Sequence, residues 1–160
     1  MSALVYKRYM SPIGALSLVA NDSYLVSILF EGEQFDDELG EDFSENSHEI
    51  LDDTSTQLDE YFLGTRKTFD LPLLVDGTAF QKVVWNELLN IPYGETISYS
   101  EQAARMGNPK AVRAVGATNG KNHLPIVIPC HRVIGKNGTL TGYAGGVDIK
   151  KFLLNLELTA

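Results

Sequence analysis

Helix-start signals punctuate the second half of this chain and restrict it to short helices joined by turns. Thr78 with Gln81, and Ser98 with Glu101, have the spacing of a capping box, in which side chains satisfy free backbone N–H groups at a helix start. Gly107-Asn108-Pro109 combines a left-handed helix end, an N-cap and a proline suited to the first helical position. These signals predict consecutive helices over 80–91, 98–107 and 109–119.

The second and third of these helices are separated by about two residues, which is the spacing of a helix-turn-helix. An ordinary corner between two packed helices has the same spacing, so both interpretations stay open here. The third helix reads Lys-Ala-Val-Arg-Ala-Val-Gly-Ala and carries few long polar side chains for reading base edges. Its small residues either pack on a neighbouring helix or allow close, sequence-blind approach to DNA. Arg113 could enter a base stack as a side-chain wedge.

The first half has the pattern of a small sheet. Short alternating segments over 4–9, 15–20 and 24–30 are separated by Ser11-Pro12-Ile13-Gly14 and Asn21-Asp22-Ser23, which predicts a three-stranded antiparallel meander. The acidic run 31–49 predicts a solvated loop or helix face, and 56–62 a helix. We therefore expect an α+β fold with two domains, an α/β domain over 1–76 and a mostly helical domain over 77–160.

Charge divides the chain in the same place. The net charge is -8, yet residues 1–76 hold 16 acidic against 4 basic side chains, a balance of -12, and residues 77–160 hold 5 against 9, a balance of +4. Such asymmetry favours a polyanionic partner for the second half, although an acidic surface can also serve solubility alone. No stretch approaches 18 apolar residues and no apolar segment follows Lys7 and Arg8, so we expect a soluble, cytoplasmic protein.

Cys130 is the single cysteine, so no disulfide can form within the chain. The segment from Leu124 to Val133, Leu-Pro-Ile-Val-Ile-Pro-Cys-His-Arg-Val, predicts a short apolar strand that presents Cys130 next to His131. A thiol reacts as the thiolate, and a nearby imidazole lowers its pKa or takes its proton. A buried cysteine that only packs is the common alternative. One cysteine and three histidines without ligand spacing predict no metal site.

A histidine base needs an orienting partner, and the C-terminal segment offers Glu157. It lies at the rim of a predicted helical stripe formed by Ile149, Phe152, Leu153 and Leu156. An exposed glutamate at a helix end is the alternative. Tyr143-Ala144-Gly145-Gly146 predicts either a plain turn or a loop whose backbone approaches a flat ligand.

Several motifs occur in one uninterrupted order: 80–85 (Phe-Gln-Lys-Val-Val-Trp), 91–96 (Ile-Pro-Tyr-Gly-Glu-Thr), 107–109, 114–116 (Ala-Val-Gly), Asn122, Pro-Cys-His-Arg-Val and 143–146. On these motifs the sequence resembles the O6-alkylguanine-DNA alkyltransferases, also called methylated-DNA–protein-cysteine methyltransferases. The resemblance covers about half the chain. The first half is similar only in outline, and there the family implies a ribonuclease H-like fold with a supportive role.

The resemblance implies a DNA repair protein. Such a protein would bind duplex DNA in the minor groove through its helix-turn-helix, with little sequence specificity, and would flip the damaged nucleotide out of the stack. It would then transfer a methyl or other alkyl group irreversibly from O6-alkylguanine to Cys130, acting once per molecule. O4-alkylthymine as a second substrate stays open. No cofactor is implied, and we expect a monomer.

The family's residue roles carry over to matching positions. Cys130 would be the acceptor, His131 would take its proton through a water, and Glu157 would hold the imidazole. Tyr99 would donate a hydrogen bond to the purine, and Asn122 would join the DNA-reading helix to the active site. The expected DNA contacts are Arg113 as an arginine finger, with Asn108, Ala111, Ala114 and Gly116. The expected base pocket is formed by Val133, Tyr143 and Ala144.

Two departures and three rival classes accompany this interpretation. The chain lacks the cysteines that bind zinc in some family members, and its length suggests a stand-alone protein without a second cysteine-bearing domain. The rivals are a non-enzymatic relative that signals alkylation damage, a Cys-His hydrolase built on Cys130, His131 and Glu157, and a plain DNA-binding module. The first is disfavoured because such relatives replace the acceptor cysteine. The hydrolase is disfavoured because adjacent Cys and His rarely form a dyad directly.

Overall fold

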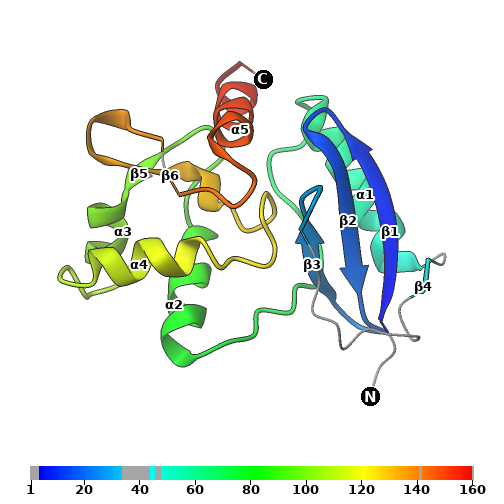
Figure 1. Ribbon diagram of the computed structural model, residues 1–160, viewed down its shortest axis with the longest axis horizontal. Helices are drawn as coiled ribbons and strands as arrows, with labels where there is room; N and C mark the ends of the chain where they lie inside the picture. Colours follow the sequence, from blue (N-terminus) through cyan, green and yellow to red (C-terminus); the bar gives the residue numbers. More distant parts are fainter. Residues whose placement is uncertain (1–3, 34–43, 46–47, 141, 160) are drawn as a thin grey trace. The chain divides into compact units, whose positions relative to one another are not determined.

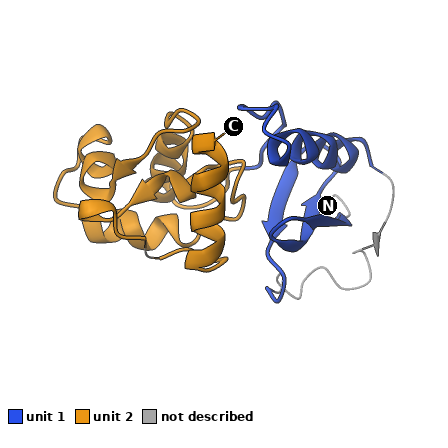
Figure 2. Cartoon of the chain, turned by 90° about the horizontal axis from the view of Figure 1, so that it is seen from above, with its two compact units in different colours: residues 1–74 blue, residues 75–160 orange. Residues whose placement is uncertain are grey.

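The computed structural model describes residues 4–33, 44–45, 48–140 and 142–159 (Figure 1). The chain divides into two units, residues 1–74 and 75–160 (Figure 2). Strands dominate the first unit and helices the second, so the predicted α+β class is confirmed. Among the described residues, no helix has the length and apolar character that crossing a bilayer requires.

The sheet of the first unit is the predicted meander. Strands β1 (Val5–Ser11), β2 (Gly14–Ala20) and β3 (Leu25–Leu29) pair antiparallel, and a two-residue strand β4 (Ser44–Glu45) pairs parallel with β1. The sheet order is β3-β2-β1-β4. Gly14 has φ +105 at the β1–β2 turn, a conformation that L side chains rarely adopt.

Helix α1 (Glu49–Phe62) packs on strands β1 and β2 through Leu51, Leu58 and Tyr61, which are fully buried. The sequence predicted a helix only over 56–62, and this boundary is wrong. The first turn carries acidic residues, which a helix N-terminus favours but which conceal the apolar periodicity. Most of the acidic run 31–49, namely 34–43 and 46–47, lies outside the described residues.

The second unit opens with helix α2 (Ala79–Leu88), whose Thr78–Gln81 capping box is present as predicted. Helix α3 (Tyr99–Arg105) begins at Ser98, whose hydroxyl accepts from the Glu101 N–H. Gly107 follows this helix with φ +75, which confirms the left-handed helix end.

Helix α4 (Val112–Asn119) begins three residues later than predicted, so the N-cap at Asn108 and the first helical position at Pro109 are wrong. The Asn108 carbonyl instead accepts from the Ala111 N–H in a turn, and Ala111 takes the N-cap position without a side-chain cap. The connection from α3 to α4 therefore spans 106–111, longer than the two residues expected. Helices α3 and α4 still pack together as a helix pair.

Buried amides join the helices of this pair. Gln102 and Asn119 exchange two side-chain hydrogen bonds, Nε2 to Oδ1 at 3.0 Å and Nδ2 to Oε1 at 2.7 Å. The indole N–H of Trp85 in α2 donates to the Thr118 carbonyl in α4 at 2.9 Å. These bonds satisfy polar groups that would otherwise be costly to bury, and they fix α4 against α2 and α3.

A two-stranded parallel sheet of β5 (Ile97–Ser98) and β6 (Val133–Ile134) crosses this unit, and helix α5 (Val147–Thr159) ends it. A 3-10 helix η2 (Cys130–Arg132) immediately precedes β6, and a second one, η3 (Lys136–Gly138), follows it. Tyr99 begins α3 directly after β5, so the paired strands bring the starts of α3 and η2 into the same region.

Candidate active site around Cys130

The segment before Cys130 is a series of turns, and the short strand predicted between Pro125 and Pro129 is wrong. The Ile128 N–H donates to the Leu124 carbonyl, and the Cys130 N–H donates to the Ile128 carbonyl, both at 2.8 Å. Pro125 and Pro129 lack the N–H that a strand ladder uses, and Ile126 has φ +75, which reverses the chain. A β-branched residue in this region is an outlier that the surrounding structure must hold in place.

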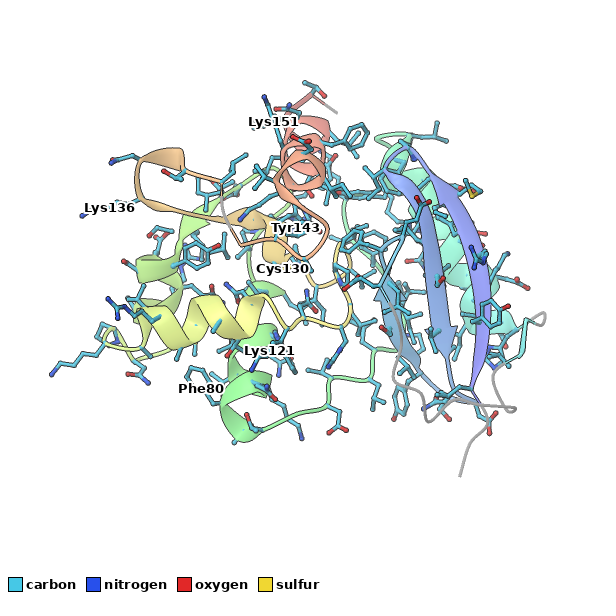
Figure 3. All side chains as sticks on the ribbon, viewed as in Figure 1. Phe80, Lys121, Cys130, Lys136, Tyr143 and Lys151 are labelled. Carbon is cyan, nitrogen blue, oxygen red and sulfur yellow. The ribbon has the colours of Figure 1, made fainter. Side chains whose placement is uncertain are left out.

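Cys130 lies inside the second unit (Figure 3), with 8% of its surface exposed. Asn122 Nδ2 donates to Cys130 Sγ at 3.2 Å and to the Ile128 carbonyl at 2.8 Å. Asn122 Oδ1 accepts from the Leu124 N–H at 2.9 Å, so both ends of the amide are engaged. Burial raises the pKa of the Cys130 thiol, while the Asn122 hydrogen bond and the Lys150 charge lower it. The sulfur therefore has a hydrogen-bond donor already aimed at it.

His131 is fully buried and contacts the predicted carboxylate, with Nε2 lying 2.5 Å from Glu157 Oε2. Burial lowers the pKa of His131, and the hydrogen bond and charge of Glu157 oppose this shift. A neutral imidazole facing an ionised carboxylate carries its proton on Nε2, which leaves Nδ1 as the acceptor. No group in the described part of the chain forms a hydrogen bond with that Nδ1.

Arg132 and the backbone of Gly94 also hold Glu157. Arg132 donates from Nε to Oε1 at 2.8 Å and from Nη2 to Oε2 at 3.2 Å, and the Gly94 N–H donates to Oε1 at 3.1 Å. Arg132 Nη1 also donates to the Ile91 carbonyl at 2.7 Å. Burial raises the pKa of Glu157, but His131 and Arg132 outweigh burial and lower it to about 2. The carboxylate is therefore ionised at neutral pH.

The buried face of α5 differs from the predicted stripe. Its buried residues are Lys150, Leu153 and Glu157, whereas Phe152 is 39% exposed. The buried face of the helix is therefore rotated relative to the prediction. Lys150 and Glu157 can be buried because each has a polar partner, Tyr99 for the lysine and His131 for the glutamate. The spacing 150, 153, 157 is itself helical, so this face was detectable had Lys150 been counted with it.

Lys150, like Arg132, is a site residue that sequence reasoning missed, and it is 1% exposed. Its Nζ lies 3.5 Å from the Tyr99 hydroxyl and 5.8 Å from the centre of the Tyr99 ring. Burial lowers the pKa of Lys150, and the charge of Cys130 raises it. The lysine is therefore a buried cation that contacts the tyrosine, and its charge also acts on the cysteine.

Tyr99 lies between two glycines. A Cβ atom on Gly116 of α4 would lie 3.6 Å from the Tyr99 ring, and one on Gly142 would lie 3.7 Å from the Tyr99 hydroxyl. Gly116, a predicted DNA contact, thus lies against the tyrosine ring. The loop after η3 carries Tyr143, whose hydroxyl is buried, and Ala144, which is exposed, while Val133 is fully buried on β6.

Four of the five predicted DNA contacts lie in the first turn of α4 or just before it. Arg113 and Ala114 lie exposed in its first turn, Asn108 lies exposed in the preceding turn, and Ala111 is half-buried at the N-cap. No hydrogen bond or ion pair that the described residues show links these positions to Cys130. These positions are separate from the buried Cys130–His131–Glu157 group.

A cavity of about 320 Å³ lies beside α5, with Ile134, Leu140, Leu154 and Glu157 among its lining residues. Cys130 does not line this cavity, so we do not assign it to the substrate. Within the described ranges, no three His, Cys, Asp or Glu side chains come together as metal ligands.

Comparison with known proteins identifies the family of this chain. Residues 79–159 match the family model described as "6-O-methylguanine DNA methyltransferase, DNA binding domain", and residues 4–75 match its "ribonuclease-like domain". The chain therefore belongs to the 6-O-methylguanine DNA methyltransferase family.

Relatives named methylated-DNA–protein-cysteine methyltransferase include one from Methanosarcina acetivorans, which is 49% identical over 96% of this chain and 98% of the relative. A constitutive one from Bacillus subtilis is 47% identical over 95% and 94%. The crystal structure of Mycobacterium tuberculosis OGT in complex with DNA superposes with a TM-score of 0.89 at 42% identity, covering 97% of this chain and 93% of that one.

Proposed function

We propose that this protein repairs alkylated duplex DNA by transferring a methyl or other alkyl group from O6 of guanine to Sγ of Cys130. One observation carries the proposal: the single thiol accepts a hydrogen bond from Asn122 and adjoins a neutral His131 that Glu157 holds by Nε2. The names of the relatives and the DNA complex of the M. tuberculosis protein support the same activity.

The transfer needs a thiolate, and His131 is its base. The thiol proton passes to Nδ1, through a water if the two atoms are not in contact, and the resulting imidazolium is stabilised by the ionised Glu157. Asn122 and Lys150 stabilise the negative sulfur, since both lower the pKa of the thiol. The sulfur then attacks the alkyl carbon, a sulfur–carbon bond forms and the carbon–oxygen bond of the guanine breaks.

The departing guanine oxygen takes the electron pair of the broken bond, and the purine becomes an anion. Tyr99 donates a hydrogen bond to the purine as this charge develops, beside the positive Lys150. The product at Cys130 is a thioether, which has no proton to lose and does not react again. Each molecule therefore acts once.

DNA binding belongs to the start of α4. Arg113 is exposed there beside small residues, so the helix can lie close to the sugar–phosphate backbone while the arginine enters the base stack. We assign minor-groove binding and nucleotide flipping to this surface, with Asn108, Ala111, Ala114 and Gly116 as further contacts. Val133, Tyr143 and Ala144 would border the flipped base.

The two domains divide the work. We propose that residues 77–160 bind DNA and accept the alkyl group, while residues 1–76 support them. The protein would act as a monomer in the cytoplasm, without a metal or other cofactor. The cationic balance of the second half suits its DNA partner, and the acidic first half contributes solubility.

Intact-mass measurement after incubation with a duplex containing O6-methylguanine tests the proposal. We expect a permanent gain of about 14 Da, one methyl replacing one hydrogen, which peptide mapping places on Cys130. Cys130→Ala should bind the duplex with unchanged affinity and gain no mass. A hydrolase would instead show steady turnover of an ester, and a plain DNA-binding module would leave the mass of the wild-type protein unchanged. Either outcome rejects alkyl transfer.

A further inference from the structure

The hydroxyl of Tyr99 has two neighbours, the ammonium group of Lys150 and the backbone of Gly142. Lys150 Nζ lies 3.5 Å from this hydroxyl, and a Cβ atom on Gly142 would lie 3.7 Å from the same oxygen. Gly142 itself is exposed, in the loop that leads into α5. Any side chain longer than a methyl group at position 142 would therefore extend from a point in contact with the hydroxyl.

We propose that Gly142 is a positioning residue for alkyl transfer: the missing side chain keeps the Tyr99 hydroxyl within reach of the departing purine. This inference rests on the proposed function and on Tyr99 as the donor to the leaving group. A side chain at position 142 would cover the hydroxyl and compete for its hydrogen bond. The donor would then be lost at the moment when negative charge develops on the purine.

Two physical reasons for glycine at this position can be separated. Gly142 has φ +66, a conformation that favours glycine whatever space surrounds it. Asparagine tolerates this region, and Asn137 in η3 adopts φ +67. Gly142→Asn therefore keeps the backbone conformation and fills the space beside Tyr99.

The chain offers a matched control at the end of η3. Gly138 has φ +79, and a Cβ atom there would have no heavy atom within 4 Å. Gly138→Asn thus introduces the same side chain at the same backbone conformation, but away from Tyr99. A difference between the two variants reports on the space beside the hydroxyl and not on the backbone.

The experiment measures the rate constant for labelling of Cys130 by saturating free O6-benzylguanine, which avoids DNA binding. We expect Gly142→Asn and Tyr99→Phe each to slow labelling roughly tenfold or more, the effect of losing one hydrogen bond to a charged group. The double variant should be no slower than Tyr99→Phe alone, because both changes remove the same interaction. Gly138→Asn should label at the wild-type rate.

A second substrate separates positioning from general damage. An 8-aza analogue of O6-benzylguanine has a more acidic purine, which needs less assistance as it leaves. The loss caused by Gly142→Asn should be smaller with this analogue, whereas a distorted site would slow both substrates equally. If Gly142→Asn does not fold, as judged by thermal unfolding, Gly142→Ser takes its place in the same comparisons, with Gly138→Ser as its control.

The outcomes distinguish this inference from the function on which it rests. If the wild-type protein gains no mass from the O6-methylguanine duplex, the proposed function fails. If it gains that mass but free O6-benzylguanine does not label it, the same variants are compared by their rate of methyl transfer from the duplex. If the wild-type protein is labelled but the substitution at 142 leaves the rate unchanged, only the role of Gly142 is overturned. The role is also overturned if the substitution at 142 lowers the labelling rate of the Tyr99→Phe variant by the same factor as that of the wild-type protein.

Discussion

Arg132 holds Glu157 at two points, with Nε at 2.8 Å from Oε1 and Nη2 at 3.2 Å from Oε2, and both side chains are buried. A buried ion pair of this kind contributes little net stability, but removing one partner leaves an uncompensated charge. Here the pair keeps the carboxylate ionised and fixed in orientation. His131 therefore always faces an acceptor on the Nε2 side.

Acid should destabilise the protein through this cluster. Glu157 has a pKa of about 2 in the folded chain against an ordinary value of 4.5, so its contribution to stability is complete above pH 4.5 and is lost as the pH falls toward 2. The loss is on the order of 3 kcal/mol. The pKa of His131 is also lowered, from 6.5, so the unfolded chain takes up a proton first and stability begins to fall below about pH 6.5.

Thermal unfolding at stepped pH values measures this loss. The melting temperature should fall steadily from pH 7 to pH 3 in the wild-type protein. Glu157→Gln should have a lower melting temperature at neutral pH and a flatter profile between pH 4.5 and pH 2. Equal slopes for the two proteins in that range would contradict the assignment.

Lys150→Met should make Cys130 less reactive at neutral pH. The lysine charge lowers the pKa of the thiol, so its removal leaves burial less opposed and reduces the thiolate fraction. We expect the rate of Cys130 alkylation by iodoacetamide to fall severalfold at pH 7 and to recover at higher pH. An unshifted pH–rate profile would show that the lysine charge does not act on the sulfur.

Arg113→Ala should slow duplex repair without affecting the chemistry at Cys130. The side chain is exposed on α4, and no contact that the described residues show links it to the thiol. We expect at least a tenfold loss with an O6-methylguanine duplex and a wild-type rate with free O6-benzylguanine, since only the duplex requires flipping. Lys82→Ala, an exposed cation on α2, is the matched control. Equal slowing with both substrates would remove the finger role.

Replacing one amide of the pair between α3 and α4 should lower the free energy of unfolding more than half as much as replacing both. Gln102→Leu or Asn119→Leu leaves one buried amide without its partner, a loss of about 1–3 kcal/mol. The double substitution removes both polar groups and should be less destabilising than the sum of the two single changes. Urea denaturation of the four proteins gives the coupling free energy. Strict additivity would show that the two amides do not stabilise each other.

Local signals in the sequence predicted much of the fold and the central part of the site. The capping box at Thr78 and the left-handed Gly107 were read correctly because each depends only on nearby residues. The meander followed from alternation and turn residues. The predicted apolar stripe of the last helix had the wrong rotation, yet it placed Glu157 correctly beside His131. This is because Leu153 and Glu157 share the buried face in both the predicted and the observed arrangement.

Features that depend on tertiary partners escaped prediction. Lys150 and Arg132 are charged residues that sequence patterns place on the surface, and only their partners across the fold allow burial. Ile126 could not be assigned a positive φ from its type, because β-branched residues disfavour that region. A turn before α4 takes the place of the expected cap at Asn108, because the Asn108 carbonyl accepts a backbone hydrogen bond from the Ala111 N–H.

The limited exposure of Cys130 also affects how long the unalkylated protein keeps its ability to accept an alkyl group. A side chain that can react only once is lost for good when it meets a stray oxidant or electrophile in bulk water. Little of this cysteine faces solvent, and burial favours the less reactive thiol over the thiolate. Burial makes the thiol depend on a base and a hydrogen-bond donor for its reaction. The same burial therefore protects Cys130 from inactivation until the protein binds damaged DNA.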